Sequence, residues 1–306
     1  MPLLPESAYV LPGAVESYPW REQQMMKKPA GPLLAACLAA SFLVLNTPGP
    51  QALAARLQTA RHFTDEKIVG IVGAWGVLPT QDHSQPEIPQ GVRTILDRYQ
   101  TLYIGSPAEK KVYLTFDEGY EKGYTPGILD TLAKRRVPAA FFVTGHYVKK
   151  HPDLVKRMVA EGHIVGNHTM THPSLRGLAT GQIKAELDGV NEAFTALTGQ
   201  TMHYLRPPRG EYDENSLATA SRLGYRTVFW SLAMADWLPL PGGPAESRAT
   251  VTNRLHSGAI ILLHAVSADN AAALDDILHD IKDAGYSFGT LDQLAAGSLP
   301  APAAAS

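Results

Sequence analysis

The stretch "YLTFDEGYEKG", residues 113–123, begins as an apolar run and ends in charge. Its first half is typical of a buried strand, and its second half places two acids, Asp117 and Glu118, side by side before a glycine. An isolated pair of acids at a strand end is ordinarily a solvated turn, because loops lie on the surface. The pair becomes informative only if other strands of the chain also end in polar side chains.

Six further apolar runs follow the one at 111–116, which makes seven strand candidates. Most are separated by segments with helical spacing, such as the stripe from Ile183 to Leu197 that ends at Gly199 and the segment between Asp213 and Gly224. Strands that alternate with helices indicate a parallel sheet in an α/β fold. The other runs lie at 138–143, 163–166, 203–205, 225–231, 259–263 and 286–290.

Polar residues recur just beyond the ends of these strands. In a βα barrel the loops at the carboxyl ends of the strands meet on one face, whereas an open sheet spreads them out. We therefore expect a barrel in which five strands contribute to one site. The five residues are Asp117, His168, Arg206, Asp236 and His264.

The segment "GNHTMTHPSL", residues 166–175, places His168 and His172 four positions apart. This spacing sets two imidazoles on one side of a helical turn, where they can share a divalent metal. A solvated loop is the alternative, because HxxxH arises by chance in a chain with 11 histidines. With an acid from position 117 or 118 the set becomes two histidines and one carboxylate, which is typical of catalytic zinc.

Composition narrows the class of partner. The 306 residues are 45% hydrophobic and 18% charged, with a net charge of −2 and no long basic run, so we expect no nucleic-acid or anionic-membrane partner. Neutral polymers or small molecules are the expected partners. The single cysteine, Cys37, excludes an intramolecular disulfide framework, and a metal site must use histidines and carboxylates.

The N-terminal part predicts export. Residues 25–54 contain two lysines, an apolar stretch and the motif "ALA" at 52–54, the order of a secretory signal peptide with its cleavage site. Fewer than ~18 apolar residues run uninterrupted, which disfavours a permanent membrane helix. Lipidation at Cys37, within "LAAC", is the other alternative. Residues 1–24 precede a complete signal pattern, so we expect a misplaced start codon.

These patterns divide the chain into four segments. Residues 1–54 form the signal region, and 55–109 form an arm or linker whose Pro- and Gln-rich part argues against regular structure. Residues 110–297 hold the rhythmic βα pattern, and 298–306 form a tail expected to be disordered.

Five motifs in order resemble those of the NodB-type polysaccharide deacetylases, carbohydrate esterase family 4. They are "TFDEG", "HTMTH", "RPPRG", "ADW" and "ILLH", and the resemblance spans about 110–297. The fuller wording, including "TFDEGYEKGYT" and "LLHAVSADNAAALDD", is most similar to the sporulation peptidoglycan N-acetylmuramic acid deacetylases, also called delta-lactam-biosynthetic de-N-acetylases. The resemblance implies a distorted (β/α)7 barrel.

It also implies an activity: metal-dependent hydrolysis of the N-acetyl group of peptidoglycan N-acetylmuramic acid, toward the muramic delta-lactam of spore cortex. The implied cofactor is a divalent metal ion, zinc, and the implied partner is the peptidoglycan glycan strand. The protein is expected to act as a monomer in the cell wall or spore cortex. Deacetylases of N-acetylglucosamine polymers, chitin and xylan are close competitors.

The family pattern assigns the two acids of the opening stretch different roles. It implies Asp117 as the general base, acting on a water whose pKa a bound metal lowers toward ~7. His168, His172 and the second acid are the implied metal ligands. The family usually has aspartate at this second position, and here Glu118 carries one more methylene. Its side chain either still reaches the metal or swings away from it.

The remaining motifs supply the rest of the implied site. His264 would protonate the departing amine, with Asp236 supporting its cationic form, and Arg206 would hold the base ionised. The backbone N–H of Arg209 would stabilise the oxyanion, and Trp237 would form a wall of the pocket.

Two other classes of function remain open. A noncatalytic glycan-binding module would explain the glutamate as the mark of a decayed metal site, although the intact motifs around it argue against decay. A metal-dependent hydrolase of another bond, such as a peptidase or an O-acetyl esterase, is the second class. The HExxH pattern of helix-borne peptidase sites is absent from the histidine segment.

Overall fold

The structure is a computed structural model that describes residues 73–80 and 82–297. The chain divides into two compact units, residues 1–55 and 56–306, and every described residue belongs to the second. The predicted signal region, residues 1–54, and the predicted tail, residues 298–306, lie outside the described residues.

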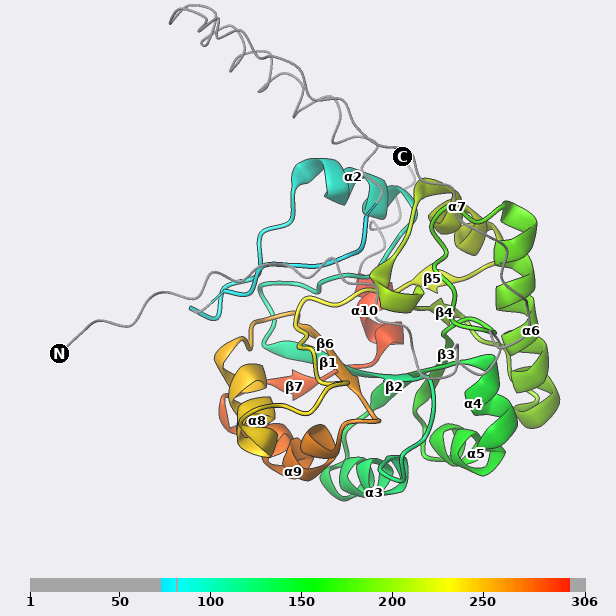
Figure 1. The fold of residues 1–306 in the computed structure, drawn as a ribbon. Coiled ribbons are helices and arrows are strands. Elements are labelled where there is room, and N and C mark those ends of the chain that lie inside the picture. Colours follow the sequence, from blue (N-terminus) through cyan, green and yellow to red (C-terminus); the bar gives the residue numbers. More distant parts are fainter. Residues whose placement is uncertain (1–72, 81, 298–306) are drawn as a thin grey trace, which may run out of the picture. The chain divides into compact units, whose positions relative to one another are not determined.

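Parallel strands form the centre of the fold, and each of the seven apolar runs overlaps one of them (Figure 1). Their order in the sheet is β5-β4-β3-β2-β1-β6, and β7 pairs with the first residues of β1. The predicted parallel sheet is therefore confirmed. Within the described residues the strands are β1 (Lys111–Glu118), β2 (Ala139–Val143), β3 (Ile164–Asn167), β4 (Tyr204–Leu205), β5 (Arg226–Thr227), β6 (Ile260–His264) and β7 (Ser287–Phe288).

The sheet curls until its two ends meet. Beyond β5 the chain continues alongside β6, where Leu232 N donates to Ile260 O at 3.2 Å and Leu262 N donates to Leu232 O at 2.9 Å. A parallel bridge between Leu232 and Ile261 marks the same closure. Since β4 and β5 have two residues each, the ring is irregular. The predicted distorted (β/α)7 barrel is confirmed.

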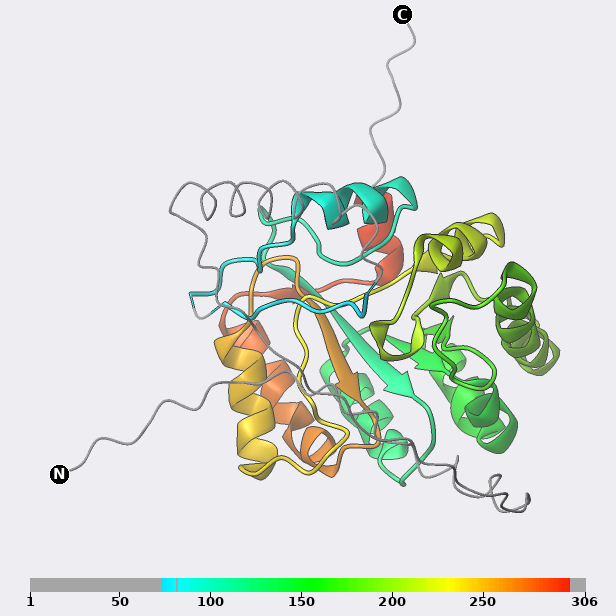
Figure 2. The same ribbon diagram turned by 45° about the horizontal axis from the view of Figure 1, so that its top comes forward.

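Helices cover the outside of the sheet (Figures 1 and 2). The predicted end of α6 at Gly199 is confirmed, as is the start of α7 at Asp213, whose side chain accepts from Ser216 N at 2.8 Å. The helices are α2 (Gln90–Arg98), α3 (Thr125–Arg135), α4 (Gly145–Lys150), α5 (Pro152–Ala160), α6 (Thr180–Thr198), the 3-10 turn η3 (Pro208–Gly210), α7 (Glu214–Arg222), α8 (Gly243–Asn253), α9 (Ala268–Asp283) and α10 (Leu291–Gly297). None of those described combines the length and apolarity that a bilayer-spanning helix requires.

Strand β1 separates two apolar clusters. Val112, Leu114 and Phe116 belong to the large cluster between sheet and helices, whereas Tyr113 belongs to the smaller one inside the barrel. Successive side chains of a strand point to opposite faces. By this alternation Asp117 continues the inner row and Glu118 the outer row.

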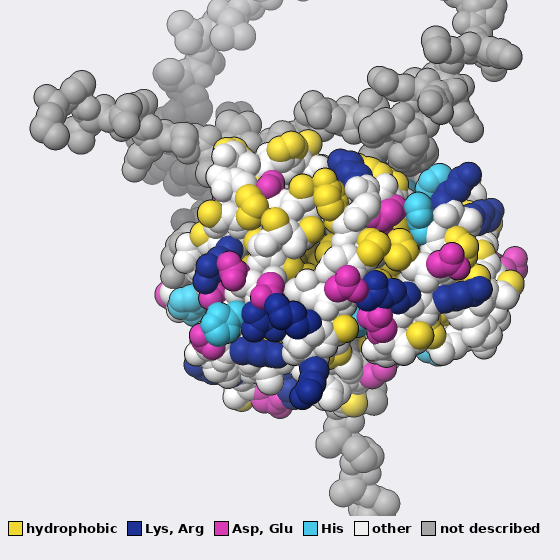
Figure 3. Space-filling view, turned by 90° about the horizontal axis from the view of Figure 1, so that it is seen from below, with side chains coloured by type: hydrophobic (Ala, Val, Ile, Leu, Met, Phe, Trp, Pro, Cys, Tyr) yellow, Lys and Arg dark blue, Asp and Glu magenta, His cyan; other side chains and the backbone are white. Residues whose placement is uncertain are grey.

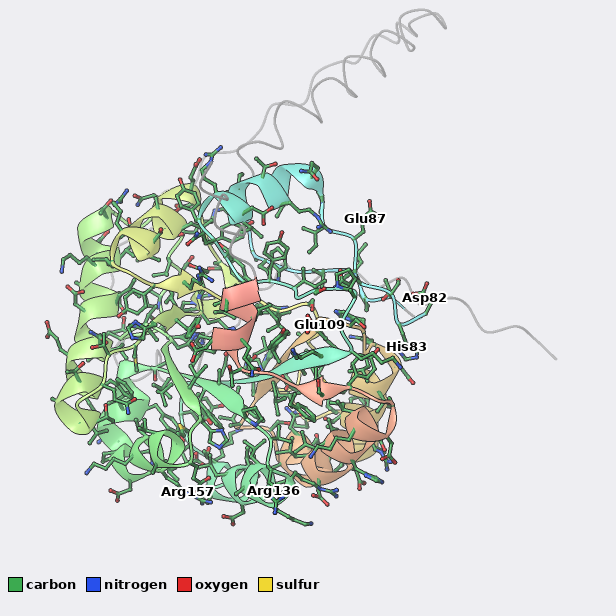
Figure 4. The ribbon with its side chains drawn as sticks, turned by 180° about the vertical axis from the view of Figure 1, so that it is seen from behind. Asp82, His83, Glu87, Glu109, Arg136 and Arg157 are labelled. Carbon is green, nitrogen blue, oxygen red and sulfur yellow. The ribbon has the colours of Figure 1, made fainter. Side chains whose placement is uncertain are left out.

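The segment before the barrel packs against it. Trp75, Ile88, Leu96 and Tyr103 are buried in a third cluster, to which α7 and the chain after β5 also contribute. Residues 84–89 form neither helix nor strand, and α2 follows directly. Figure 4 shows Asp82, His83 and Glu87 along this segment. The segment is therefore part of the folded unit.

The surface over α3, α5 and α9, viewed in Figure 3, mixes charges of both signs. Arg135 pairs with Asp275, and Arg157 with Asp130 and Glu161. Exposed pairs of this kind stabilise a fold by about 0–1 kcal/mol each, so they contribute little beside the core.

Candidate active site

Asp117 and His264 are neighbours across the sheet although they lie 147 positions apart in the chain. They are register partners at the carboxyl ends of β1 and β6, which lie side by side (Figure 2). Adjacent strands are ~4.8 Å apart, and register partners point to the same face. The barrel thus presents a carboxylate and an imidazole together at one end.

Asp117 forms a buried ion pair with Arg206. Nη1 of Arg206 donates to Oδ1 of Asp117 at 2.8 Å, and the arginine side chain is completely buried. Burial alone would raise the pKa of Asp117, but the positive charge of Arg206, together with that of His264, outweighs it and leaves the pKa below its ordinary value. The predicted pairing is present, and it keeps the carboxylate ionised.

His264 is held by Asp236. Its Nδ1 donates to Oδ1 of Asp236 at 2.7 Å, and its backbone N donates to Oδ2 at 2.9 Å. Burial lowers the pKa of His264, but the charge and hydrogen bond of Asp236 outweigh it, so the pKa lies above its ordinary value. A fifth of the His264 side chain is exposed. The imidazole therefore keeps its proton to higher pH than a free imidazole and reaches solvent.

Asn270 is a site residue that the sequence reasoning missed. From the first turn of α9 its amide donates to Oδ2 of Asp236 and, at 3.3 Å, to the backbone O of His264. Ser247 Oγ donates to Oδ1 of Asn270 at 2.7 Å and fixes which way the amide faces. The available signal was its place six residues after His264, at the start of a helix.

The two histidines meet without a helical turn. The backbone after β3 is irregular, with φ of 68° at Thr169 and 60° at His172, both in the left-handed region that non-glycine residues rarely adopt. Asn167 Oδ1 supports this loop by accepting from Thr169 N at 2.8 Å. The ring centroids of His168 and His172 lie 4.8 Å apart. The expected helical turn is wrong, but the expected proximity is confirmed.

The chemistry of the histidine pair fits a divalent cation. Burial lowers the pKa of both rings, that of His172 to about 3, so both are neutral, as metal ligands must be. His168 Nδ1 donates to the carbonyl of Arg206 at 2.8 Å, which leaves the Nε2 lone pair 3.5 Å from Oδ2 of Asp117. The open lone pair of a neutral imidazole nitrogen is a ligand that a divalent cation accepts.

Glu118 does not join this pair. Its Oε1 accepts from Thr125 Oγ1 at 3.4 Å on the helix side of the sheet, and its Oε2 has no hydrogen-bond partner in the described part of the chain. Burial, and then the nearby charge of Glu121, raise the pKa of Glu118 well above its ordinary value. Residues 73–80 and 82–297 contain no group of three His, Cys, Asp or Glu side chains that could hold a metal. The predicted set of His168, His172 and Glu118 is thus not assembled, because the strand alternation turns Glu118 outward.

Arg209 and Trp237 flank the site. Arg209, with a left-handed φ of 57° in η3, pairs with Glu211 at 2.9 Å, and its charge helps to lower the pKa of His172. The Trp237 ring stands edge-on to His264 with centroids 5.1 Å apart and is 46% exposed. Arg209 thus lies on the side of the two histidines, and Trp237 lies beside His264.

Comparison with known proteins agrees with this geometry. The polysaccharide deacetylase family matches residues 104–228. The peptidoglycan-N-acetylmuramic acid deacetylase PdaA of Bacillus subtilis is 48% identical over 222 residues, which are 72% of this chain and 84% of that protein. The chain belongs to the polysaccharide deacetylase family, carbohydrate esterase family 4.

Solved structures of this enzyme family have the same fold. That of B. subtilis PdaA, a family 4 carbohydrate esterase, superposes with a TM-score of 0.69 at 47% identity and covers 72% of this chain and 95% of its own. A family 4 carbohydrate esterase from Bacillus anthracis gives 0.60 at 42% identity, with 72% and 99% covered. The resemblance that the five motifs indicated is confirmed.

Proposed function

We propose that this protein hydrolyses the N-acetyl group of N-acetylmuramic acid in peptidoglycan and releases acetate. The observation that carries the proposal is a pair of groups on neighbouring strands whose pKa values are shifted in opposite directions, that of Asp117 downward and that of His264 upward. Two titratable groups whose environments separate their pKa values are the mark of a base and an acid that work together. The 48% identity to PdaA supports muramic acid as the substrate.

The residues divide the reaction between them. Asp117 takes a proton from the attacking water, whose oxygen bonds to the amide carbon. His264 gives its proton to the nitrogen as the C–N bond breaks, so that acetate and a free amine result. The backbone N–H of Arg209 is the proposed donor to the developing oxyanion.

His168 and His172 are the proposed holders of a divalent metal ion, zinc. When bound, the ion supplies Lewis-acid polarisation and acidifies water. The neutral state of both rings supports this assignment. Because Glu118 points elsewhere, we propose that the two imidazoles ligate the metal ion without the glutamate.

The product also fits a role in cortex maturation. Deacetylated muramic acid carries a free amine beside its lactyl group, and these are the two groups that a muramic delta-lactam joins. We therefore propose that the protein acts before lactam closure, in the wall or spore cortex. Deacetylation of N-acetylglucosamine polymers is the alternative activity, and noncatalytic glycan binding is the alternative without chemistry.

The test is mass spectrometry of peptidoglycan fragments and of chitin oligomers after incubation with the protein. We expect the loss of one acetyl group located on muramic acid. Loss from glucosamine would favour the alternative activity. Glycan binding without any released acetate would support the noncatalytic alternative and overturn the proposal.

A further inference from the structure

The segment that precedes the region matched by the family contacts the loop that carries Arg209. Residues 73–75 precede the matched region, 104–228, yet they pair with the loop that carries Arg209. Trp75 N donates to Gly210 O at 2.8 Å, and Tyr212 N donates to Gly73 O at 3.2 Å. An antiparallel bridge joins Ala74 to Glu211 between these bonds. The loop therefore gains a strand-like partner from a distant part of the sequence.

The Trp75 side chain adds a second anchor. Its ring is buried and stacks on Phe229 with centroids 5.1 Å apart, and its Nε1 donates to the carbonyl of Trp230 at 2.7 Å. Gly210, with φ of 66°, lies so close that an added Cβ would come within 2.8 Å of the Trp230 ring and 3.2 Å of Trp75 Cβ. The loop is thus packed directly against both tryptophans.

Arg206 holds the same backbone from inside the barrel. Its Nε donates to Val228 O at 3.3 Å and its Nη2 to Phe229 O at 3.4 Å, while Nη1 binds Asp117. The carbonyl oxygens of residues 228, 229 and 230 are consecutive. Arg206 donates hydrogen bonds to the first two, and Trp75 donates one to the third. Any shift of this segment moves the guanidinium that holds the catalytic carboxylate.

We propose that Trp75 is a positioning residue for deacetylation, acting through the segment 228–230 on Arg206 and through Gly210 on the loop of Arg209. This inference rests on the proposed function, because it concerns the geometry of that site. The bonds that anchor Trp75 go to this segment and this loop, so its effect is on alignment. A misplacement of about 1 Å at a reacting group can cost on the order of 10²-fold in rate.

The experiment compares Trp75→Phe and Trp75→Ala with the intact chain. Phenylalanine keeps the stacking on Phe229 and loses only the Nε1 donor, so we expect kcat to fall about 10-fold, and about 10²-fold for alanine, with KM changed less than about 2-fold. Hydrogen exchange of the peptide spanning 206–212 should speed up in the same order. The phenylalanine variant keeps the test decisive where alanine prevents folding.

Tyr103→Phe is the matched control. The Tyr103 ring also contacts the Trp75 ring, with centroids 5.6 Å apart, and its hydroxyl donates to Oδ1 of Asp97 at 2.7 Å rather than to the 228–230 segment. We expect its kcat and exchange to equal those of the unaltered chain. An unchanged 206–212 exchange rate in Trp75→Phe, or an equal loss of kcat in Tyr103→Phe, would overturn the inference. An unaltered chain that releases no acetate would instead overturn the proposed function, while the exchange result would still decide the role of Trp75.

Discussion

Asp236 sets the protonation of His264, and its removal should be visible in the pH dependence of kcat/KM. The reaction needs the protonated imidazole, whose pKa the charge of Asp236 holds above its ordinary value against the effect of burial. This group therefore loses its proton, and the enzyme its activity, at a higher pH than a free imidazole would. Asp236→Asn removes that charge, so the basic limb should move to lower pH. The control is Asp269→Asn, because the carboxylate of Asp269 accepts from Leu240 N rather than from His264. A basic limb that stays in place would contradict the assignment of His264 as the acid.

Glu118 should tolerate replacement by its amide. The carboxyl is fully buried and its pKa is raised well above the ordinary value, which favours the neutral form, and that form is close in shape and charge to glutamine. We expect Glu118→Gln to keep metal content and acetate release near those of the unaltered protein, whereas His168→Ala and His172→Ala should lose both. Elemental analysis with an acetate assay on the same preparations measures this. Metal loss in Glu118→Gln equal to that in His168→Ala would show that the glutamate is a ligand.

The limits of sequence reasoning at this scale lie in side-chain direction. The positions after strand ends identified Asp117, Arg206 and His264 because parallel strands deliver their ends to one face. Glu118 was harder, because its role depends on which face of β1 is the inner one, and that is settled by the place of Tyr113 in the inner cluster and by the pairing of Asp117 with Arg206. Asn270 left almost no signal, since its role arises from the way α9 packs back on β6.

At the scale of the elements, the close packing between the residues just before β6 and the segment before β1 depends on one glycine. Gly258 has φ of 77°, its N donates to Lys111 O at 2.8 Å, and an added Cβ would lie 2.5 Å from the backbone carbon of Gly105. Backbone strain and overpacking each cost about 1–3 kcal/mol, so Gly258→Ala should lower the free energy of unfolding by on the order of 2–4 kcal/mol. Urea unfolding measures the change.

Gly181 in α6 is the control for that experiment. Nothing lies within 4 Å of a Cβ added there, and its φ is not in the left-handed region. Alanine inside a helix is favoured over glycine by about 0.5–1 kcal/mol, so Gly181→Ala should be neutral or slightly stabilising. Equal unfolding midpoints for the two variants would contradict the proposed role of the close approach at Gly258.

The helices and strands themselves could be predicted from helix-capping residues and from the spacing of apolar residues. Apolar runs predicted each strand of residues 73–80 and 82–297, and the helix signals at Asp213 and Gly199 marked a real helix start and a real helix end. The closure of the barrel did not follow in the same way, because the bonds of Leu232 to β6 join segments that only the tertiary fold brings together. Local sequence patterns indicate whether a segment is a helix or a strand, whereas the pairing that closes the barrel depends on the whole sheet.

For the molecule as a whole, export is a prediction that the described residues leave open. The signal pattern in 25–54 predicts a mature chain that starts near Ala55 and so retains Trp75 with the rest of the packed segment. N-terminal sequencing of secreted protein is the measurement. A start at a lipidated Cys37, or an uncleaved chain in the membrane fraction, would contradict this. Replacement of the residue at the cleavage motif, Ala54→Phe, should block processing, whereas Ala60→Phe should not.

The division of labour between Asp117 and His264 is tested most directly by measuring acetate release from peptidoglycan and metal content together, on Asp117→Asn, His264→Ala and the unaltered protein. General acid–base catalysis contributes about 10²–10⁴-fold, so each variant should lose that factor in kcat while its metal stoichiometry stays near that of the unaltered protein. Asp117→Asn that keeps full activity, or that loses its metal as His168→Ala is expected to, would contradict the account.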